Sequence, residues 1–296
     1  MSELGVRTIA LTCLLVACDA GVKTEPPAPS PVAPKPVAPK PAGPDLTYLP
    51  ANVDVVFKID VALLRESKLW PLYNQLVERS LVPGKPCEHP LDDVSTVMVG
   101  MAVKSEASVL VFRGIDQQKL LACLHQPGAA TFDGGFATVH NTNTVDVLRF
   151  VDPHTLVVER AKQATRPSLE RDVAHDKTLV DALAKLPAKA GIAMASRPGS
   201  ADLAEKWTTV GTHLEALTGT LAGGDELKLE LAMVVRTHDE AEQFANMMKA
   251  QLKAATTMFD RIETTAQDRT VTIDIALGEA KLTSLMTMLG GVLVPP

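Results

Sequence analysis

The sequence predicts an α+β protein with two consecutive modules, each in the order β-α-β-β-α-β-β, with antiparallel sheets backed by helices. Three observations predict this class. Short β-branched apolar runs alternate with amphipathic stretches, turn residues separate neighbouring runs, and the same order of elements occurs twice along the chain. An antiparallel sheet with helices on one face would cover the apolar side of every element in such a module.

The first module, residues 47–188, opens with an apolar, β-branched strand at residues 53–59. Asp60 is a good N-cap for a helical stretch over residues 61–79, which Pro71 divides in two. Asp116 caps the next helix. Further strands are expected at residues 94–101, 108–113, 136–140, 145–151 and 155–159, and a connecting helix at residues 177–186. The run from Val109 to Phe112 has no polar break, so this sheet should be covered on both faces, one of them by the second module.

The second module, residues 189–296, opens with a strand at residues 191–195 and continues with a helix over roughly residues 201–215. Residues 227–235 then largely alternate apolar and polar side chains, which fits an antiparallel sheet with one face in water. Lys228, Glu230 and Arg236 should lie on that open face and form a binding surface. Thr237 begins a capping box before an amphipathic helix. The remaining strands are expected at residues 217–221, 262–266 and 270–277, and a last helix follows them.

The segment Leu15-Val16-Ala17-Cys18 closes an apolar run that is too short to span a bilayer. It resembles the lipobox of bacterial lipoprotein signal peptides. The resemblance implies that residues 1–17 are a signal peptide, that Cys18 carries lipid, and that the protein lies in the cell envelope, facing the periplasm or the exterior. An ordinary cleavable signal with a chance cysteine is the alternative. The body resembles uncharacterised envelope proteins with duplicated ferredoxin-like modules, which implies no activity and no site residues.

Residues 18–46 form a proline-rich linker. Residues 26–44 contain nine prolines, and the pentapeptide at residues 31–35 is repeated at residues 36–40. Proline at this density favours an extended polyproline helix, which at ~3.1 Å per residue can reach roughly 60 Å. We interpret the linker as a semi-rigid tether, with a docking segment for a proline-reading partner or the cell wall as the alternative.

Cys87 and Cys123 are the two cysteines left after the signal peptide and the anchor are set aside. Paired cysteines are typical of oxidising compartments, so we expect a disulfide between them. Both residues also belong to Cys-x-His pairs, with His89 and His125, which offer two sulfurs and two nitrogens to a metal ion. The spacing is shorter than in usual zinc sites. Free thiols are the third alternative.

Charge and motifs exclude several classes of function. The net charge of −6 and the isoelectric point near 5.7 argue against nucleic-acid binding. No nucleophile elbow, phosphate-binding loop, dinucleotide fingerprint or zinc-protease motif is present. Asp54 and Asp60 could share a strand face as a carboxylate pair, but Asp60 is better explained as a helix cap. The sequence therefore predicts no catalytic residues, no cofactor and no metal ligands.

The favoured hypothesis is a non-catalytic, lipid-anchored envelope protein that binds a partner protein or acts in envelope assembly. The first alternative is a carrier of an apolar ligand or lipid in a groove between sheet and helices. Six of the ten methionines occur at or after Met233, and methionine suits adaptable apolar surfaces, although core packing is the better explanation of them. The second alternative is an unrecognised hydrolase.

Overall fold

The structure is a computed structural model that describes residues 46–71, 74, 92–103, 105, 107–141, 144–162, 177–200 and 213–293. Its strands are β1 (Val55–Asp60), β2 (Thr96–Ala102), β3 (Ala107–Arg113), β4 (Thr131–Asp133), β5 (Phe136–His140), β6 (Val145–Asp152), β7 (Thr155–Ala161), β8 (Ile192–Ser196), β9 (Leu214–Ala222), β10 (Glu226–Val235), β11 (Arg261–Gln267) and β12 (Thr270–Gly278). Its helices are α2 (Val61–Arg65), α4 (Gln117–Leu124), α5 (Lys177–Ala184), α7 (His238–Leu252), the 3₁₀ helix η2 (Lys253–Met258) and α8 (Glu279–Leu293).

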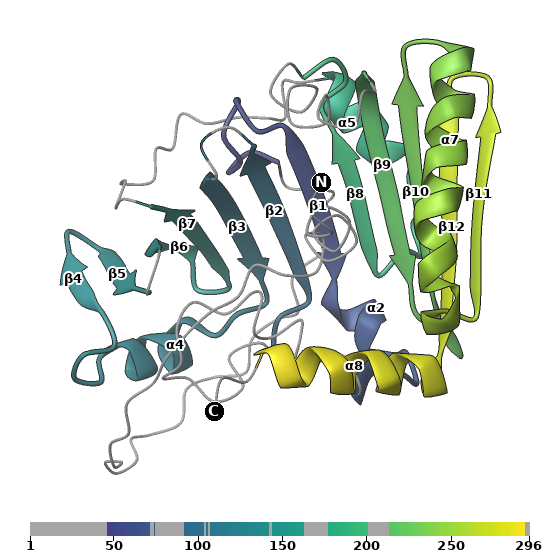
Figure 1. Ribbon diagram of the computed structural model, residues 1–296. Helices are drawn as coiled ribbons and strands as arrows, with labels where there is room; N and C mark the ends of the chain where they lie inside the picture. Colours follow the sequence, from purple (N-terminus) through teal and green to yellow (C-terminus); the bar gives the residue numbers. More distant parts are fainter. Residues whose placement is uncertain are drawn as a thin grey trace.

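All of the described strands belong to one antiparallel sheet (Figure 1). The strand order is β11-β12-β10-β9-β8-β1-β2-β3-β7-β6-β5-β4. Outward from the central pair β1 and β8, one half runs β1-β2-β3-β7-β6-β5-β4 and the other runs β8-β9-β10-β12-β11. The predicted boundary between residues 188 and 189 falls between α5 and β8, and the sheet continues across it.

The predicted fold class is therefore wrong in its main feature. The strands form a single twelve-stranded sheet rather than two helix-backed modules with a sheet each. The two halves join because β1 and β8, the first strands of the expected modules, pair over Val55–Ile59 and Ile192–Ser196. Each strand thereby satisfies backbone N–H and C=O groups that would otherwise lie on an open edge in the middle of the molecule.

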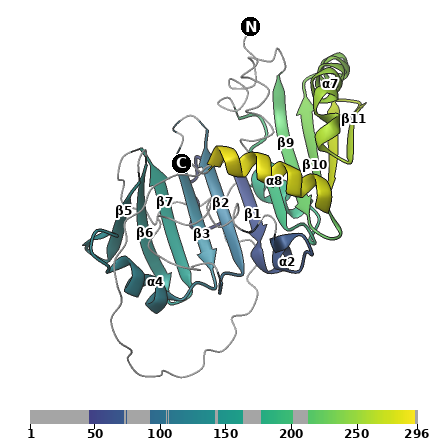
Figure 2. The same ribbon diagram turned by 60° about the horizontal axis from the view of Figure 1, so that its bottom comes forward.

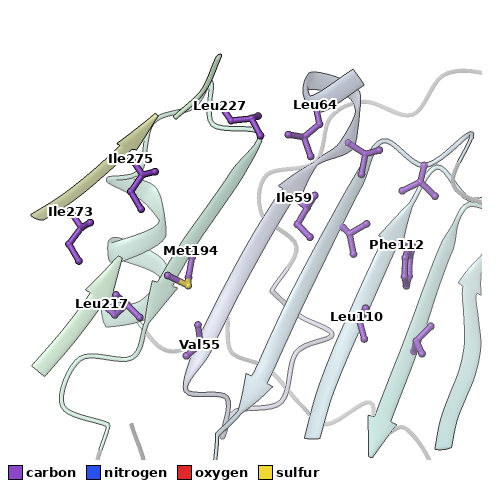
Figure 3. Packing of buried hydrophobic residues seen from close by; sticks show 14 of the residues in the cluster. Val55, Ile59, Leu64, Leu110, Phe112, Met194, Leu217, Leu227, Ile273 and Ile275 are labelled. Atoms are coloured by element: carbon purple, nitrogen blue, oxygen red, sulfur yellow. The ribbon is translucent and has the colours of Figure 1, made fainter. Parts of the chain in front are cut away.

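A hydrophobic core lies on each face of the sheet. On the face covered by α7, here called the α7 face, strand residues of both halves pack with side chains of α2, α4, α7 and α8. Figure 3 shows members of this layer from both halves, including Ile59, Phe112, Met194 and Ile275. In Figures 1 and 2, α8 crosses the strand direction from the end of β12 towards the first half.

The opposite face, here called the α5 face, has its own smaller core. Val56, Val109 and Val111 pack there with Leu179 of α5 and with Leu49 from the segment before β1. The run from Val109 to Phe112 is fully buried and alternates between the two cores, so the expectation of cover on both faces is confirmed. Its cover on this face is α5 and the segment before β1, and the second half of the chain is a lateral extension of the same sheet.

Helix starts follow the predicted caps. The Asp60 carboxylate accepts the Leu63 N–H at 2.9 Å, and Asp116 accepts two N–H groups of α4. Thr237 Oγ1 accepts the Glu240 N–H at 3.1 Å at the start of α7. In each case an oxygen satisfies an N–H group that lacks a partner within its helix. These local signals were sufficient because they depend on residues at most three positions apart.

Three elements differ from the prediction. Helix α2 ends at Arg65, and the hydroxyl of Ser67 accepts the Leu69 N–H, a local bond that competes with helix continuation. Strand β9 begins at Leu214, inside the predicted helix over residues 201–215, whose residues 201–212 lie outside the described part. Strand β4 was not predicted, although two glycines with positive φ, Gly134 and Gly135, form its turn to β5.

Replacing Gly114 by alanine should lower the free energy of unfolding by at least about 2 kcal/mol. Gly114 has φ +88°, and a Cβ there would lie 2.4 Å from the backbone oxygen of Asp93. Gly128→Ala is the matched control, because its φ is +80° and a Cβ would meet nothing within 4 Å. It should cost about 1 kcal/mol. Urea unfolding of both variants measures the difference, and equal losses would show that the contact with Asp93 is relieved without cost.

Candidate functional site

Of the sequence-predicted site residues, the structure describes one. Cys123 lies on α4 and is disulfide-bonded. Cys18, with the rest of the signal peptide and the linker before residue 46, and Cys87 lie outside the described residues, so lipidation and the pairing with Cys87 stay predictions. A sulfur in a disulfide is not a thiolate, so this arrangement does not offer Cys123 to a metal ion. Within the described residues, no group of three His, Cys, Asp or Glu side chains could hold one.

Reducing the disulfide of Cys123 should destabilise the protein. If it closes the 36 residues back to Cys87, the chain-entropy model gives a loss of about 3–4 kcal/mol. The melting temperature with and without a phosphine reductant measures the loss, and a non-reducing peptide map identifies the partner. A free thiol at Cys87 in the unreduced protein would contradict the predicted pairing.

Among the residues that the structure describes, no helix covers the α5 face over β9, β10, β12 and β11. The cross-strand partners Thr218, Ala232, Thr272 and Thr265 continue the row of Ala195, which belongs to the core under α5, because directly paired residues share a face. Along this part of the face the side chains of Lys228, Glu230, Glu263 and Thr265 are exposed. The predicted solvated face is thus present, with Lys228 and Glu230 on it. Arg236 is exposed too, but it follows the end of β10.

A row of three carboxylates crosses this open face. Glu230 of β10 pairs directly with Asp274 of β12, which pairs with Glu263 of β11. Side chains in such positions have Cβ atoms about 4.5–5.5 Å apart, and like charges there are destabilising. Lys228, two residues from Glu230 on the same strand, contacts Glu226 at 3.1 Å. The face is therefore charged and accessible rather than apolar.

A hollow of about 440 Å³ lies between this face and the end of α5. Thr218, Thr220 and Glu230 line it on the sheet side, and Lys185 and Leu186 line it on the α5 side. Its wall combines two hydroxyls, one carboxylate and one ammonium group with small apolar surfaces. Such a lining suits polar peptide groups better than an acyl chain.

A second hollow, of about 670 Å³, lies at the end of the strands around the turn from β9 to β10. Asp225 on its rim contacts Lys68 at 2.6 Å. The hydrogen bond and the charge of each residue lower the pKa of Asp225 and raise the pKa of Lys68. Both side chains are largely exposed, so water and salt screen this pair and it contributes little to stability.

The sequence did not reveal that the buried carboxylate of Asp54 accepts hydrogen bonds from distant parts of the chain. Its Oδ1 accepts the Ser200 hydroxyl at 2.6 Å, and its Oδ2 accepts the Val103 N–H at 2.9 Å. The backbone oxygen of Asp54 also accepts the Arg197 N–H. Asp60 caps α2, so the two aspartates have separate structural partners. A polar residue directly before an apolar strand was the only signal in the sequence.

Most of the described methionine side chains in the C-terminal region belong to the core. Met233 and Met248 are buried on the α7 face, and Met247 packs against the same core. The side chains of Met286 and Met288 lie outside the described part. The structure therefore supports core packing for Met233, Met247 and Met248.

None of the helices in the described part of the chain is both long enough and apolar enough to cross a bilayer. No protein-family model and no curated protein matches this chain. Among solved structures, crystal form I of TP0453 matches with a TM-score of 0.53 and 13% identity, over 84% of this chain and 98% of that one. Crystal form III of the same protein gives a TM-score of 0.49 and 12% identity, over 84% of this chain and 99% of that one. At this identity the likeness shows a shared fold with TP0453 and nothing of its activity.

Proposed function

We propose that this chain is a non-catalytic protein of the cell envelope, anchored by lipid on Cys18, that binds a partner protein through the open α5 face of β9, β10, β12 and β11. The evidence for this binding face is that the two faces of these strands differ. The α7 face of these strands is covered by α7, whereas the α5 face exposes Lys228, Glu230, Glu263 and Thr265. An exposed, charged face backed by a packed core can bind a partner protein whose surface carries complementary charges.

The anchor and the location rest on the sequence. The lipobox at residues 15–18 supports lipid on Cys18, and the proline-rich linker supports a body held away from the membrane. The non-catalytic assignment rests on the absence from the sequence of any motif that sets a nucleophile beside a base. A role in envelope assembly is the form of partner binding that agrees with these features.

Intact mass spectrometry of the membrane-extracted protein tests the anchor. The expected product starts at Cys18 and carries a diacylglyceryl group on sulfur and an acyl group on the new N-terminus. Cys18→Ser should abolish the added mass and release the protein from the membrane in a carbonate wash. A mature protein that starts elsewhere, without lipid, would contradict the proposal.

Site-specific photo-crosslinking tests the binding face. A photoreactive amino acid at Thr220, in the hollow beside α5, should give a discrete protein adduct in intact cells. The same group at Gln118, exposed on α4, should not give that adduct. Thr218→Arg, which fills the hollow, should reduce the adduct from position 220. An adduct with phospholipid in place of protein would favour the apolar-ligand alternative, and identical products from both positions would refute a specific face.

A further inference from the structure

The two halves of the sheet differ at their outer strands. In the first half, β6 pairs with β7, the strand that follows it along the chain, and β7 pairs with β3. In the second half, β11, β12 and β10 are connected and paired in the same way. Strand β6 also pairs with β5 on its outer side, whereas no described strand lies beyond β11 (Figure 1). The position that β5 fills in the first half is therefore open in the second.

The outer side of β11 is available for backbone pairing. Residues 261–267 pair with β12 without a register shift, and within the described part of the chain their backbone makes no other hydrogen bond. The strand contains no proline, no lysine and no bulge, and neither of its charged residues points inward to the core. Such a row of unpaired N–H and C=O groups is a template for another strand.

Strand β5 shows which kind of strand fits such a position. It runs antiparallel to β6. Its residues on the α7 face, Ala137 and Val139, are apolar and buried in the core. Thr138 and His140 alternate with them and therefore point to the α5 face, where neither is buried. A strand that extends this sheet thus has apolar side chains on the α7 face and polar side chains on the α5 face.

Strand β11 has the same division between its two faces. On the α7 face, Ile262 and Ala266 pack against the core but are only half-buried, so apolar side chains beside them would complete their cover. On the α5 face, Arg261 and Glu263 are exposed, and neither forms an ion pair within the described residues. Opposite charges on directly paired residues stabilise a sheet. The best-fitting strand therefore carries an acid opposite Arg261 and a base opposite Glu263.

We propose that β11 is a docking edge for an extended strand of a partner protein, which adds antiparallel to β11 as β5 adds to β6. Apolar residues of the added strand lie opposite Ile262, Thr264 and Ala266. An acidic residue lies opposite Arg261 and a basic residue opposite Glu263. Main-chain hydrogen bonds supply the affinity, and the alternating side chains supply the specificity. The contact uses the strand edge and leaves the α5 face free, so it can fail or hold independently of the function proposed above.

Fluorescence anisotropy of a labelled peptide with the full-length chain in detergent tests the edge. The probe, Thr-Val-Thr-Val-Lys-Val-Glu, is written antiparallel to residues 261–267, with its Glu opposite Arg261 and its Lys opposite Glu263. Its dissociation constant should lie below about 1 mM. Amides of alternate residues point to opposite sides of a strand, so the probe methylated on its three valine amides and the probe methylated on the intervening amides should differ. One of them should bind at least about tenfold more weakly than the other.

Exchanging the two charges of β11 tests the register. The double variant Arg261→Glu with Glu263→Arg should weaken the probe about tenfold and strengthen, by a similar factor, the peptide in which Lys and Glu are exchanged. Glu230→Arg, two strands inside the edge, is the matched control and should change neither constant. No binding of the probe at about 1 mM, or equal binding of the two methylated peptides, would overturn the proposal. Self-association of the chain that the probe reverses would make a second copy the occupant and overturn it too.

Discussion

Replacing Asp146 by alanine should lower the free energy of unfolding by about 3–5 kcal/mol. Asp146 is 0% exposed and lies directly opposite Arg160 in the pairing of β6 with β7. Its Oδ1 accepts Arg160 Nε at 2.8 Å, and its Oδ2 accepts Arg160 Nη2 at 3.0 Å and Asn141 Nδ2 at 3.1 Å. Alanine would leave the Arg160 guanidinium, whose side chain is 12% exposed, without its acceptor.

Two comparisons separate the buried charge from simple loss of contacts. The double variant Asp146→Leu with Arg160→Met removes both charges and should regain most of the lost stability, since an apolar pair of similar volume often equals a buried ion pair. Asp93→Ala breaks the pair with Lys119, whose side chains are 50% and 71% exposed, and should cost less than about 1 kcal/mol. Urea unfolding at neutral pH measures all three variants. A loss below about 1 kcal/mol in Asp146→Ala would show that water reaches Arg160.

The local part of the fold could be predicted from the sequence because its signals are short-range. The caps at Asp60, Asp116 and Thr237 each act on an N–H group within three residues, and all three begin helices. Period-2 alternation placed β10 and its open face correctly. The glycine pair before β5 was an available signal for the β4 hairpin that the prediction did not use.

The arrangement of the sheet could not be predicted in the same way. Whether Val55–Ile59 pairs with Ile192–Ser196 depends on residues about 140 positions apart, and nothing local records it. Two apolar strands that each begin a repeated pattern fit two separate sheets as well as one joined sheet. The ion pair of Asp146 with Arg160 is hidden for the same reason, since only the register of β6 on β7 brings the residues together.

The candidate binding face was partly visible in the sequence. Alternation along residues 227–235 identified Lys228 and Glu230 as solvated, and the structure places both on the open α5 face. The row with Asp274 and Glu263 was not visible, because it is assembled from three strands. The hollow beside the end of α5 was not visible either, because it combines Lys185 and Leu186 with residues of β9 and β10 that lie far along the chain.

Replacing Asp54 by alanine should lower the free energy of unfolding by about 2–4 kcal/mol, because hydrogen bonds to a buried charged acceptor are lost and their donors remain. Asp54 is 7% exposed, and its carboxylate joins the turn between β2 and β3, at Val103, to Ser200 after β8. It therefore links the two halves beside the β1–β8 pairing. The variant should unfold at a lower urea concentration than the wild type. The packing of the two hydrophobic cores in its folded state should stay the same.

Asp54→Asn separates the role of shape from the role of charge. The amide oxygen can still accept the Val103 N–H, and the amide nitrogen can donate to the Ser200 hydroxyl, which accepts as readily as it donates. We expect this variant to lose about 1 kcal/mol, and Ser200→Ala to lose a similar amount. If Asp54→Asn lost as much stability as Asp54→Ala, the negative charge of the carboxylate itself would be needed. If neither variant changed stability, the two halves would be held together by the β1–β8 pairing and the two cores alone.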